Sequence, residues 1–183
     1  MPISGNGWEL HIRRQGEQSR HGRKRTVGSY QVYHDGTAQA PLSGTSVETK
    51  GPGDNAVRGN GRCVEAGRYP LATQNGSHYV TLGYLVSSDP DQTPKPGLEL
   101  LETGNRTEIL VHPGHGFLAS VGCINLTSAL ASGSTDIPFV DSRTRVIAVI
   151  DDLKSYCGSR FPHYNGHPIA NSWVVIDDVP SGK

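Results

Sequence analysis

Cysteine and histidine residues are concentrated in one segment, residues 109–126, which reads Ile-Leu-Val-His112-Pro-Gly-His115-Gly-Phe-Leu-Ala-Ser120-Val-Gly122-Cys123-Ile-Asn125-Leu. A thiolate is a strong nucleophile, but a free thiol is mostly protonated at neutral pH, and a neighbouring imidazole is the usual group that takes its proton. Cys123 is therefore a candidate nucleophile, and His112 and His115 are candidate general bases.

The neighbours of Cys123 favour this chemistry. Gly122 has no side chain, so a substrate carbonyl can approach the backbone there. The N–H groups of Gly122 and Cys123 are candidate donors to an oxyanion. We expect Ser120 and Asn125 to hold the turn or to orient the imidazole.

The position of Pro113 bears on the choice of base. Proline disfavours helix for the residue before it, so we expect His112 at the end of an extended strand over residues 108–112. His115 has a glycine on each side and is a rival base that can swing into place. We prefer His112.

Two simpler interpretations compete with catalysis. Cysteine is among the most buried residue types, and Val121, Ile124 and Leu126 flank Cys123 as in a core strand. Two histidines and one cysteine are also zinc ligands, but no fourth ligand stands at the spacing of a zinc motif. We expect no metal ion and no other cofactor.

The same residues resemble the catalytic motif of the L,D-transpeptidase family. In that motif an upstream histidine is followed, after a variable insert, by Ser/Thr-His-Gly-Cys-x-Asn or Arg. Ser120, Gly122, Cys123 and Asn125 stand at the motif positions, and His112 stands at the upstream histidine. The resemblance implies that His112 is the general base.

Two features depart from the usual motif. Val121 stands where the family has its second histidine, and Cys123 lies only 11 residues after His112, a short insert. This form is more similar to the divergent L,D-transpeptidase-like toxins of type VI secretion systems. The resemblance thus implies an exported antibacterial effector, with a secretion apparatus and a cognate immunity protein as partners.

The resemblance implies an L,D-transpeptidase or L,D-carboxypeptidase that acts on peptidoglycan stem peptides. Cys123 would attack the bond after the third residue of a tetrapeptide stem, and the terminal D-alanine would leave. The thioester would then pass to water, to a D-amino acid or to a cross-linking amine. The competing hypothesis is a phage- or secretion-associated module that binds the cell wall and has lost the chemistry.

The elements that position these residues are expected to be mainly strands. Of 183 residues, 23 are glycine and 12 are proline, a composition that favours strands and turns. Alternating apolar residues over 8–13 and apolar β-formers over 26–34 predict an antiparallel hairpin, followed by a turn at Asp35-Gly36. Residues 51–61 predict a glycine-rich loop.

One helix is predicted after the candidate catalytic motif. Apolar residues recur at steps of three and four over residues 141–157, with Asp141 or Ser142 as N-cap. Residues 173–176 predict a last strand. We predict a single mainly β domain over 1–183, with the hairpin and glycine-rich loop in 1–60 and the catalytic core in 61–183.

Charge argues against nucleic acid as a partner. The 17 basic residues balance the 17 acidic ones, and the only basic run, residues 20–25, is expected at a solvated hairpin end.

Residues 1–7 hold no apolar run, and no stretch is long and apolar enough to span a membrane. We expect no signal peptide and no membrane insertion. Synthesis is expected in the cytoplasm, with export by a specialised system to the periplasm of a target cell.

Cys63 and Cys157 belong to no recognisable motif. We expect them either to form a disulfide in an oxidising compartment or to stay free.

Overall fold

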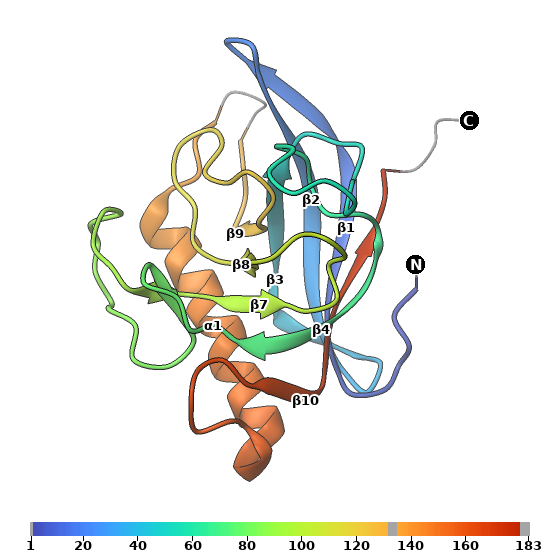
Figure 1. Cartoon of the computed structure of the whole chain (residues 1–183), viewed down its shortest axis with the longest axis vertical. Helices are drawn as coiled ribbons and strands as arrows, with labels where there is room; N and C mark the ends of the chain where they lie inside the picture. The colour runs from blue at the N-terminus through green and yellow to red at the C-terminus, as the bar shows by residue number, and fades with distance from the viewer. Residues whose placement is uncertain (1, 132–134, 180–183) are drawn as a thin grey trace.

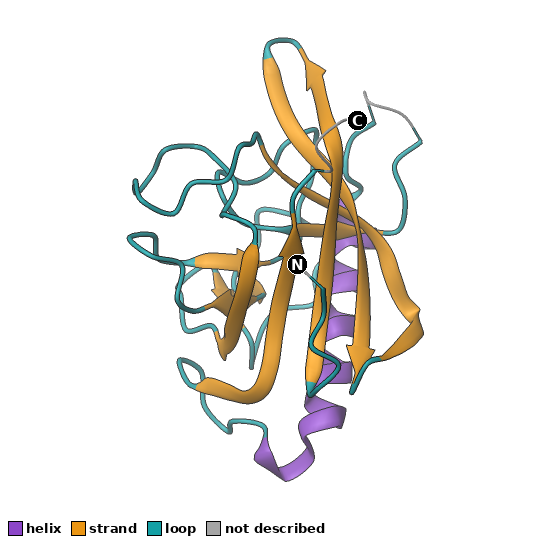
Figure 2. Cartoon of the chain, turned by 90° about the vertical axis from the view of Figure 1, so that its right-hand side faces the viewer, coloured by secondary structure: helices purple, strands orange, loops and turns teal. Residues whose placement is uncertain are grey.

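The computed structural model describes residues 2–131 and 135–179, and its main feature is one curved eight-stranded sheet with a helix packed against it (Figures 1 and 2). The strand order is β8-β7-β4-β10-β1-β2-β3-β9, and β5 and β6 form a separate pair. The fold is mainly β with one main helix after the candidate catalytic motif, as predicted. The elements are β1 (Trp8–Arg20), β2 (Arg23–His34), β3 (Thr37–Thr49), β4 (Gly67–Thr73), β5 (Tyr79–Val80), β6 (Lys95–Pro96), β7 (Leu98–Leu100), β8 (Ile109–Val111), β9 (Asn125–Thr127), α1 (Phe139–Cys157), the short 3-10 helix η1 (Gly158–Arg160) and β10 (Pro168–Asp177).

The first three strands form an antiparallel meander. The predicted hairpin is confirmed as β1 and β2, and the predicted turn at Asp35-Gly36 leads into β3, a third strand of the N-terminal region. Both turns have two successive residues with positive φ, which suits tight hairpins. Strands β1 and β2 are longer than predicted, because backbone pairing continues through the polar residues to the turn at His21 and Gly22.

The basic run at the hairpin is only partly solvated, contrary to the prediction. Arg25 is fully buried, with its guanidinium 4.3 Å from the centre of the Phe117 ring. Arg25 Nη1 donates to the backbone oxygens of Phe117 and Thr135 at 2.9 and 2.8 Å. The hairpin therefore anchors the loop that follows His112.

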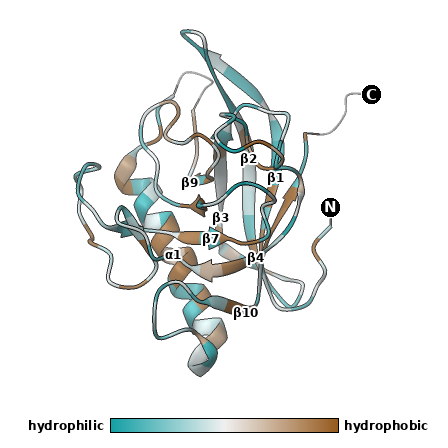
Figure 3. Ribbon diagram, in the orientation of Figure 1, coloured by the Kyte–Doolittle hydropathy of each residue, from teal (hydrophilic) through white to brown (hydrophobic). Residues whose placement is uncertain are grey.

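The last strand is confirmed, but it lies inside the sheet rather than at its end. β10 pairs in parallel with β1 and antiparallel with β4. On β1 the alternate residues Trp8, Leu10 and Ile12 are fully buried and join apolar residues of α1 in the core. Figure 3 shows the contrast between the hydrophilic tip of the β1–β2 hairpin and the hydrophobic stretches of β10 and α1.

Helix α1 begins two residues earlier than predicted, and the predicted caps are wrong. Pro138 is the N-cap residue and makes no side-chain capping bond. The Asp141 carboxylate instead accepts hydrogen bonds at the end of β9, and the Ser142 hydroxyl accepts the Gly114 N–H at 2.9 Å. These polar residues thus fasten the helix to the strand and loop on either side of the motif.

The two edges of the eight-stranded sheet meet at the motif and nearly close it. Val111 of β8 and Ile124, just before β9, form a parallel bridge. The His112 N–H donates to Ile124 O at 3.0 Å, and the Ile124 N–H donates to Leu110 O at 2.8 Å. The closure thus brings residues 110–112 and 123–125 side by side.

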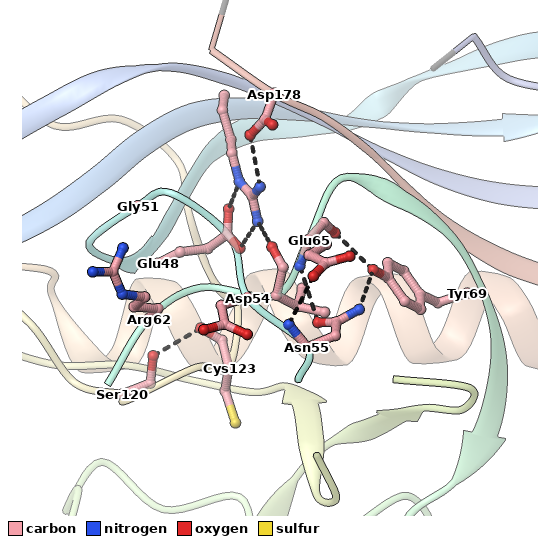
Figure 4. A network of polar contacts seen from close by, with 12 residues as sticks. Glu48, Gly51, Asp54, Asn55, Arg62, Glu65, Tyr69, Ser120, Cys123 and Asp178 are labelled. Carbon is pink, nitrogen blue, oxygen red and sulfur yellow. Dashed lines mark hydrogen bonds and ion pairs between the residues drawn. The ribbon is translucent and has the colours of Figure 1, made fainter. Parts of the chain in front are cut away.

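A buried ion pair ties the meander to the segment after the glycine-rich loop. Arg14 of β1 donates to both carboxylate oxygens of Glu48 on β3, at 2.8 and 2.7 Å. It also donates to Val64 O at 2.7 Å and to Asp178 at 3.1 Å (Figure 4). Loop 51–61 is irregular, as predicted.

The cysteines Cys63, Cys123 and Cys157 are all free, so Cys63 and Cys157 do not pair in this structure. Among the described residues, no helix is both long and apolar enough to cross a membrane.

The Arg14–Glu48 pair generates a stability prediction. Arg14→Met leaves the Glu48 carboxylate buried without its partner, so the free energy of unfolding should fall by about 3–5 kcal/mol. Urea denaturation measures this loss. The double variant Arg14→Met/Glu48→Leu leaves no buried charge without a partner, because Asp178 is exposed, and it should recover much of the stability. An equal or greater loss in the double variant would contradict this account.

Candidate active site around Cys123

The closure of the sheet places the motif residues on one face. The bridge between Val111 and Ile124 sets Cys123 opposite Leu110 and Asn125 opposite His112. Paired residues of a parallel ladder point to the same side, and alternate residues along a strand share a side. Cys123, Asn125 and His112 therefore share one face, whereas Val111 and Ile124 are fully buried in the core.

His112 is buried, and its tautomer is fixed by its neighbours. Its Nδ1 lies 2.7 Å from Pro113 O, an acceptor, and 3.4 Å from Asn125 Nδ2, which donates to His112 O at 2.9 Å instead. The shorter contact assigns the proton to Nδ1, so Nε2 keeps its lone pair. The Tyr79 ring packs against the imidazole with the centroids 4.3 Å apart. Burial lowers the pKa of His112 to about 4, with a smaller effect from Lys95, so the ring is neutral at neutral pH.

Asn125 holds the backbone at His112, and Ser120 holds the backbone at Cys123. Asn125 Nδ2 donates to His112 O at 2.9 Å. A side chain at Gly114 would collide with Asn125, since a Cβ there would lie 2.7 Å from Asn125 Cγ. The Ser120 hydroxyl donates to Cys123 O at 2.8 Å and closes the turn before the cysteine (Figure 4). Both residues act as positioning residues.

The Cys123 side chain is half-buried, and in Figure 4 its sulfur points away from the polar network around Asp54. The Leu110 N–H points to Sγ at 3.3 Å, and Glu108 O lies 3.5 Å from it. Burial raises the pKa of the Cys123 thiol to about 11; the Leu110 N–H and Arg106 oppose the rise. The resting site therefore holds a neutral thiol.

The resting pair is a neutral thiol and a neutral imidazole rather than an ion pair. In the described structure Cys123 and His112 share a face without a hydrogen bond between them. Catalytic hydrogen bonds are often long in a free enzyme and tighten in the complex with substrate. The arrangement suits a general base that takes the proton as the sulfur attacks.

The backbone before the nucleophile is available for an oxyanion. The N–H groups of Gly122 and Cys123 donate to no described residue. Gly122 has a φ of 147°, and a Cβ there would lie 1.9 Å from Arg106 Nη2. Only glycine fits at this position, so the close approach expected at Gly122 is used by the Arg106 guanidinium.

Two pockets meet at Cys123, and each has a volume of about 240 Å³. Glu108 and Cys123 line both. The first is otherwise lined by Gln74, Gly76, Ser77, His78, Tyr79 and Leu110. The second is otherwise lined by Arg58, Gly59, Arg106, Thr107, Ile109, Val121 and Gly122. The thiol thus lies where a substrate can extend to both sides.

Several of these residues carried no signal in the sequence. Tyr79 and Arg106 come from segments 44 and 17 residues before Cys123, and no motif marks them. Glu108 has a φ of 56°, a conformation that is uncommon outside glycine and visible only in the structure. The strand before His112 was predictable, but the pocket around it was not.

His115 lies apart from this arrangement. Its side chain is exposed, and its ring packs edge-on against Phe139 at the start of α1, with the centroids 6.3 Å apart. It lines neither pocket at Cys123. The described residues hold no cluster of three or more His, Cys, Asp or Glu side chains that can bind a metal ion. Of the two histidines, the geometry favours His112 as base.

Comparisons of the chain with known protein families, with curated proteins and with solved structures find no match. None of them links the chain to the L,D-transpeptidase family, so the resemblance of the motif stays a prediction. The residues and geometry around Cys123 are therefore the features of this chain that bear on its function.

The depressed pKa of His112 generates a pH prediction. Below pH 6.5 the unfolded chain protonates His112, whereas the folded protein does so only near pH 4, so stability falls as the pH drops through this window. The loss from this group amounts to about 3 kcal/mol. His112→Gln removes this titrating group. The free energy of unfolding, measured by urea denaturation at pH 7 and pH 4.5, should therefore fall less in the variant than in the parent protein. Identical pH dependence in the two proteins would contradict the burial of a neutral imidazole.

Proposed function

We propose that the protein is a cysteine-dependent L,D-transpeptidase-like enzyme that acts on peptidoglycan tetrapeptide stems. One observation carries the proposal: the thiol of Cys123 opens on two pockets and shares one face of the sheet closure with His112, whose Nε2 keeps its lone pair. The order of His112, Ser120, Gly122, Cys123 and Asn125 supports the choice of this family over other thiol enzymes.

In the proposed reaction, the carbonyl carbon of the third stem residue lies against Cys123 Sγ. The thiol proton passes to His112 Nε2 as the sulfur–carbon bond forms, and the N–H groups of Gly122 and Cys123 stabilise the oxyanion. The carbon–nitrogen bond then breaks, and the proton from His112 goes to the amine of the departing D-alanine. A thioester of the tripeptide stem on Cys123 is left.

The second half of the reaction repeats the first with a new nucleophile. His112 takes a proton from water or from an amine, which attacks the thioester, and the thiol leaves as Cys123 is reprotonated. Water gives an L,D-carboxypeptidase, and a D-amino acid gives exchange. Both pockets are open at Cys123, so each acceptor has a path to the thioester.

The proposed substrate also determines where the protein acts. Peptidoglycan lies outside the cytoplasmic membrane, so the proposal places the activity in the periplasm of a target cell. Export by a specialised secretion apparatus and a cognate immunity protein are parts of the same proposal.

The proposed function predicts release of D-alanine from tetrapeptide-stem muropeptides under reducing conditions. Cys123→Ser should abolish release, and His112→Ala should lower the rate by about 10²–10⁴-fold, because the base acts in the transition state. His115→Ala is the matched control and should retain activity, since His115 lies outside the pockets. Chromatography of the products with a D-alanine assay measures all four proteins.

Two results would contradict this function. Equal loss in the His115 and His112 variants would remove His112 as the specific base. Unaltered muropeptides, together with equal binding of the parent and of Cys123→Ala to sacculi, would favour the competing hypothesis of a cell-wall-binding module.

A further inference from the structure

We propose that the pocket on the Arg106 side of Cys123 is a carboxylate-binding subsite. Arg106 and Arg58 would bind the free carboxylate of the residue that leaves. This rests on the proposed function for the identity of the substrate, although the anion site can be tested without any turnover. The inference makes Arg106 a specificity-determining residue, which the motif does not include.

Arg106 is a buried cation without an acidic partner. Its residue is 5% exposed, and no described carboxylate lies within ion-pair distance of its guanidinium. Backbone oxygens hold it instead: Asp54 O at 3.3 Å, Arg62 O at 2.9 Å and Val121 O at 3.3 Å. A buried charge is costly unless it is paired, so a bound anion would gain the full attraction of this guanidinium.

The guanidinium also keeps donors for a ligand. Of its five N–H groups, the two on Nη1 and one on Nη2 donate to the three carbonyls. The Nε–H and the second N–H of Nη2 have no acceptor among the described residues. Nε and Nη2 are neighbouring nitrogens of one planar guanidinium, a group that binds carboxylates through its N–H donors.

The position of Arg106 relative to the nucleophile limits the ligand. Its Nη2 occupies the space that a Cβ on Gly122 would fill, one residue before Cys123. A carboxylate bound there lies close to the sulfur, which suits the α-carboxylate of the amino acid whose amide bond is attacked. A stem extended by further residues would place its carboxylate beyond this subsite.

The charges along the cleft are asymmetric. Arg58 is exposed and adds a second positive charge to the Arg106 pocket, whereas no described lysine or arginine lines the opposite pocket. Glu108 borders both pockets, so its negative charge does not distinguish them. The asymmetry orients the substrate with its anionic end toward Arg106 and Arg58.

Alkylation of Cys123 tests the subsite directly. Iodoacetate and iodoacetamide both transfer a two-carbon group to sulfur with loss of iodide, but only iodoacetate carries a carboxylate. Peptide mass spectrometry follows the rate of alkylation of Cys123 by each reagent, and glutathione serves as the reference thiol. We expect the ratio of the iodoacetate rate to the iodoacetamide rate to be about ten-fold or more higher for Cys123 than for glutathione. The iodoacetate rate should saturate, and acetate should compete with it.

Variants assign the effect to the two arginines. Arg106→Gln and the exposed Arg58→Gln should each lower the ratio, with the larger effect at Arg106, and Arg106→Lys should restore part of it. Arg160→Gln, which removes an exposed charge on η1, should leave the ratio unchanged. A ratio equal to that of glutathione, or one that neither Arg58→Gln nor Arg106→Gln changes, would overturn the subsite.

Alkylation and the D-alanine assay together separate this inference from the proposed function. A raised ratio of iodoacetate to iodoacetamide rates at Cys123, without any release of D-alanine, would retain the anion site and overturn the enzyme activity. A stem with a free C-terminal carboxylate releases D-alanine, and the same stem with a C-terminal amide releases D-alanine amide. Equal rates of release from the two substrates would retain the enzyme activity and overturn the subsite.

Discussion

The pairing of residues 110–112 with Ile124 is the constraint on which the site depends. It joins the two edges of an eight-stranded sheet, and it leaves Val111 and Ile124 in the core. Alternation along the paired segments then brings His112 and Cys123 to the same face. The burial that accompanies closure also lowers the pKa of the imidazole and raises that of the thiol, so the pair rests uncharged.

The N-terminal third of the chain supports the site through the loop before β4. Arg14, paired with Glu48, holds the carbonyl of Val64 (Figure 4). The carbonyls of Asp54 and Arg62 hold Arg106. Arg106 in turn lies against Gly122 and donates to Val121 O. A region that matches no motif is thus connected to the nucleophile by buried and part-buried polar contacts, each of which restricts the position of the next.

Local features of the fold were predictable from the sequence, because their signals lie within a few residues. The Asp35-Gly36 turn, the helix periodicity and the strand before His112 are of this kind. Contacts between distant segments were not. Ser142 binds the Gly114 N–H instead of capping α1, and Arg25 packs on Phe117, 92 residues later, instead of facing solvent. The tautomer of His112 and the pocket lining likewise depend on closure of the sheet.

Direct detection of the thioester tests the central claim, that Cys123 is a nucleophile activated by its position at the closure. The protein is mixed briefly with a tetrapeptide-stem muropeptide, quenched in acid and analysed by intact mass and peptide mapping. We predict a mass increase equal to that of the muropeptide less D-alanine, located on Cys123 and absent in Cys123→Ser. No adduct at any time point, or an adduct on Cys63 or Cys157, would contradict the account.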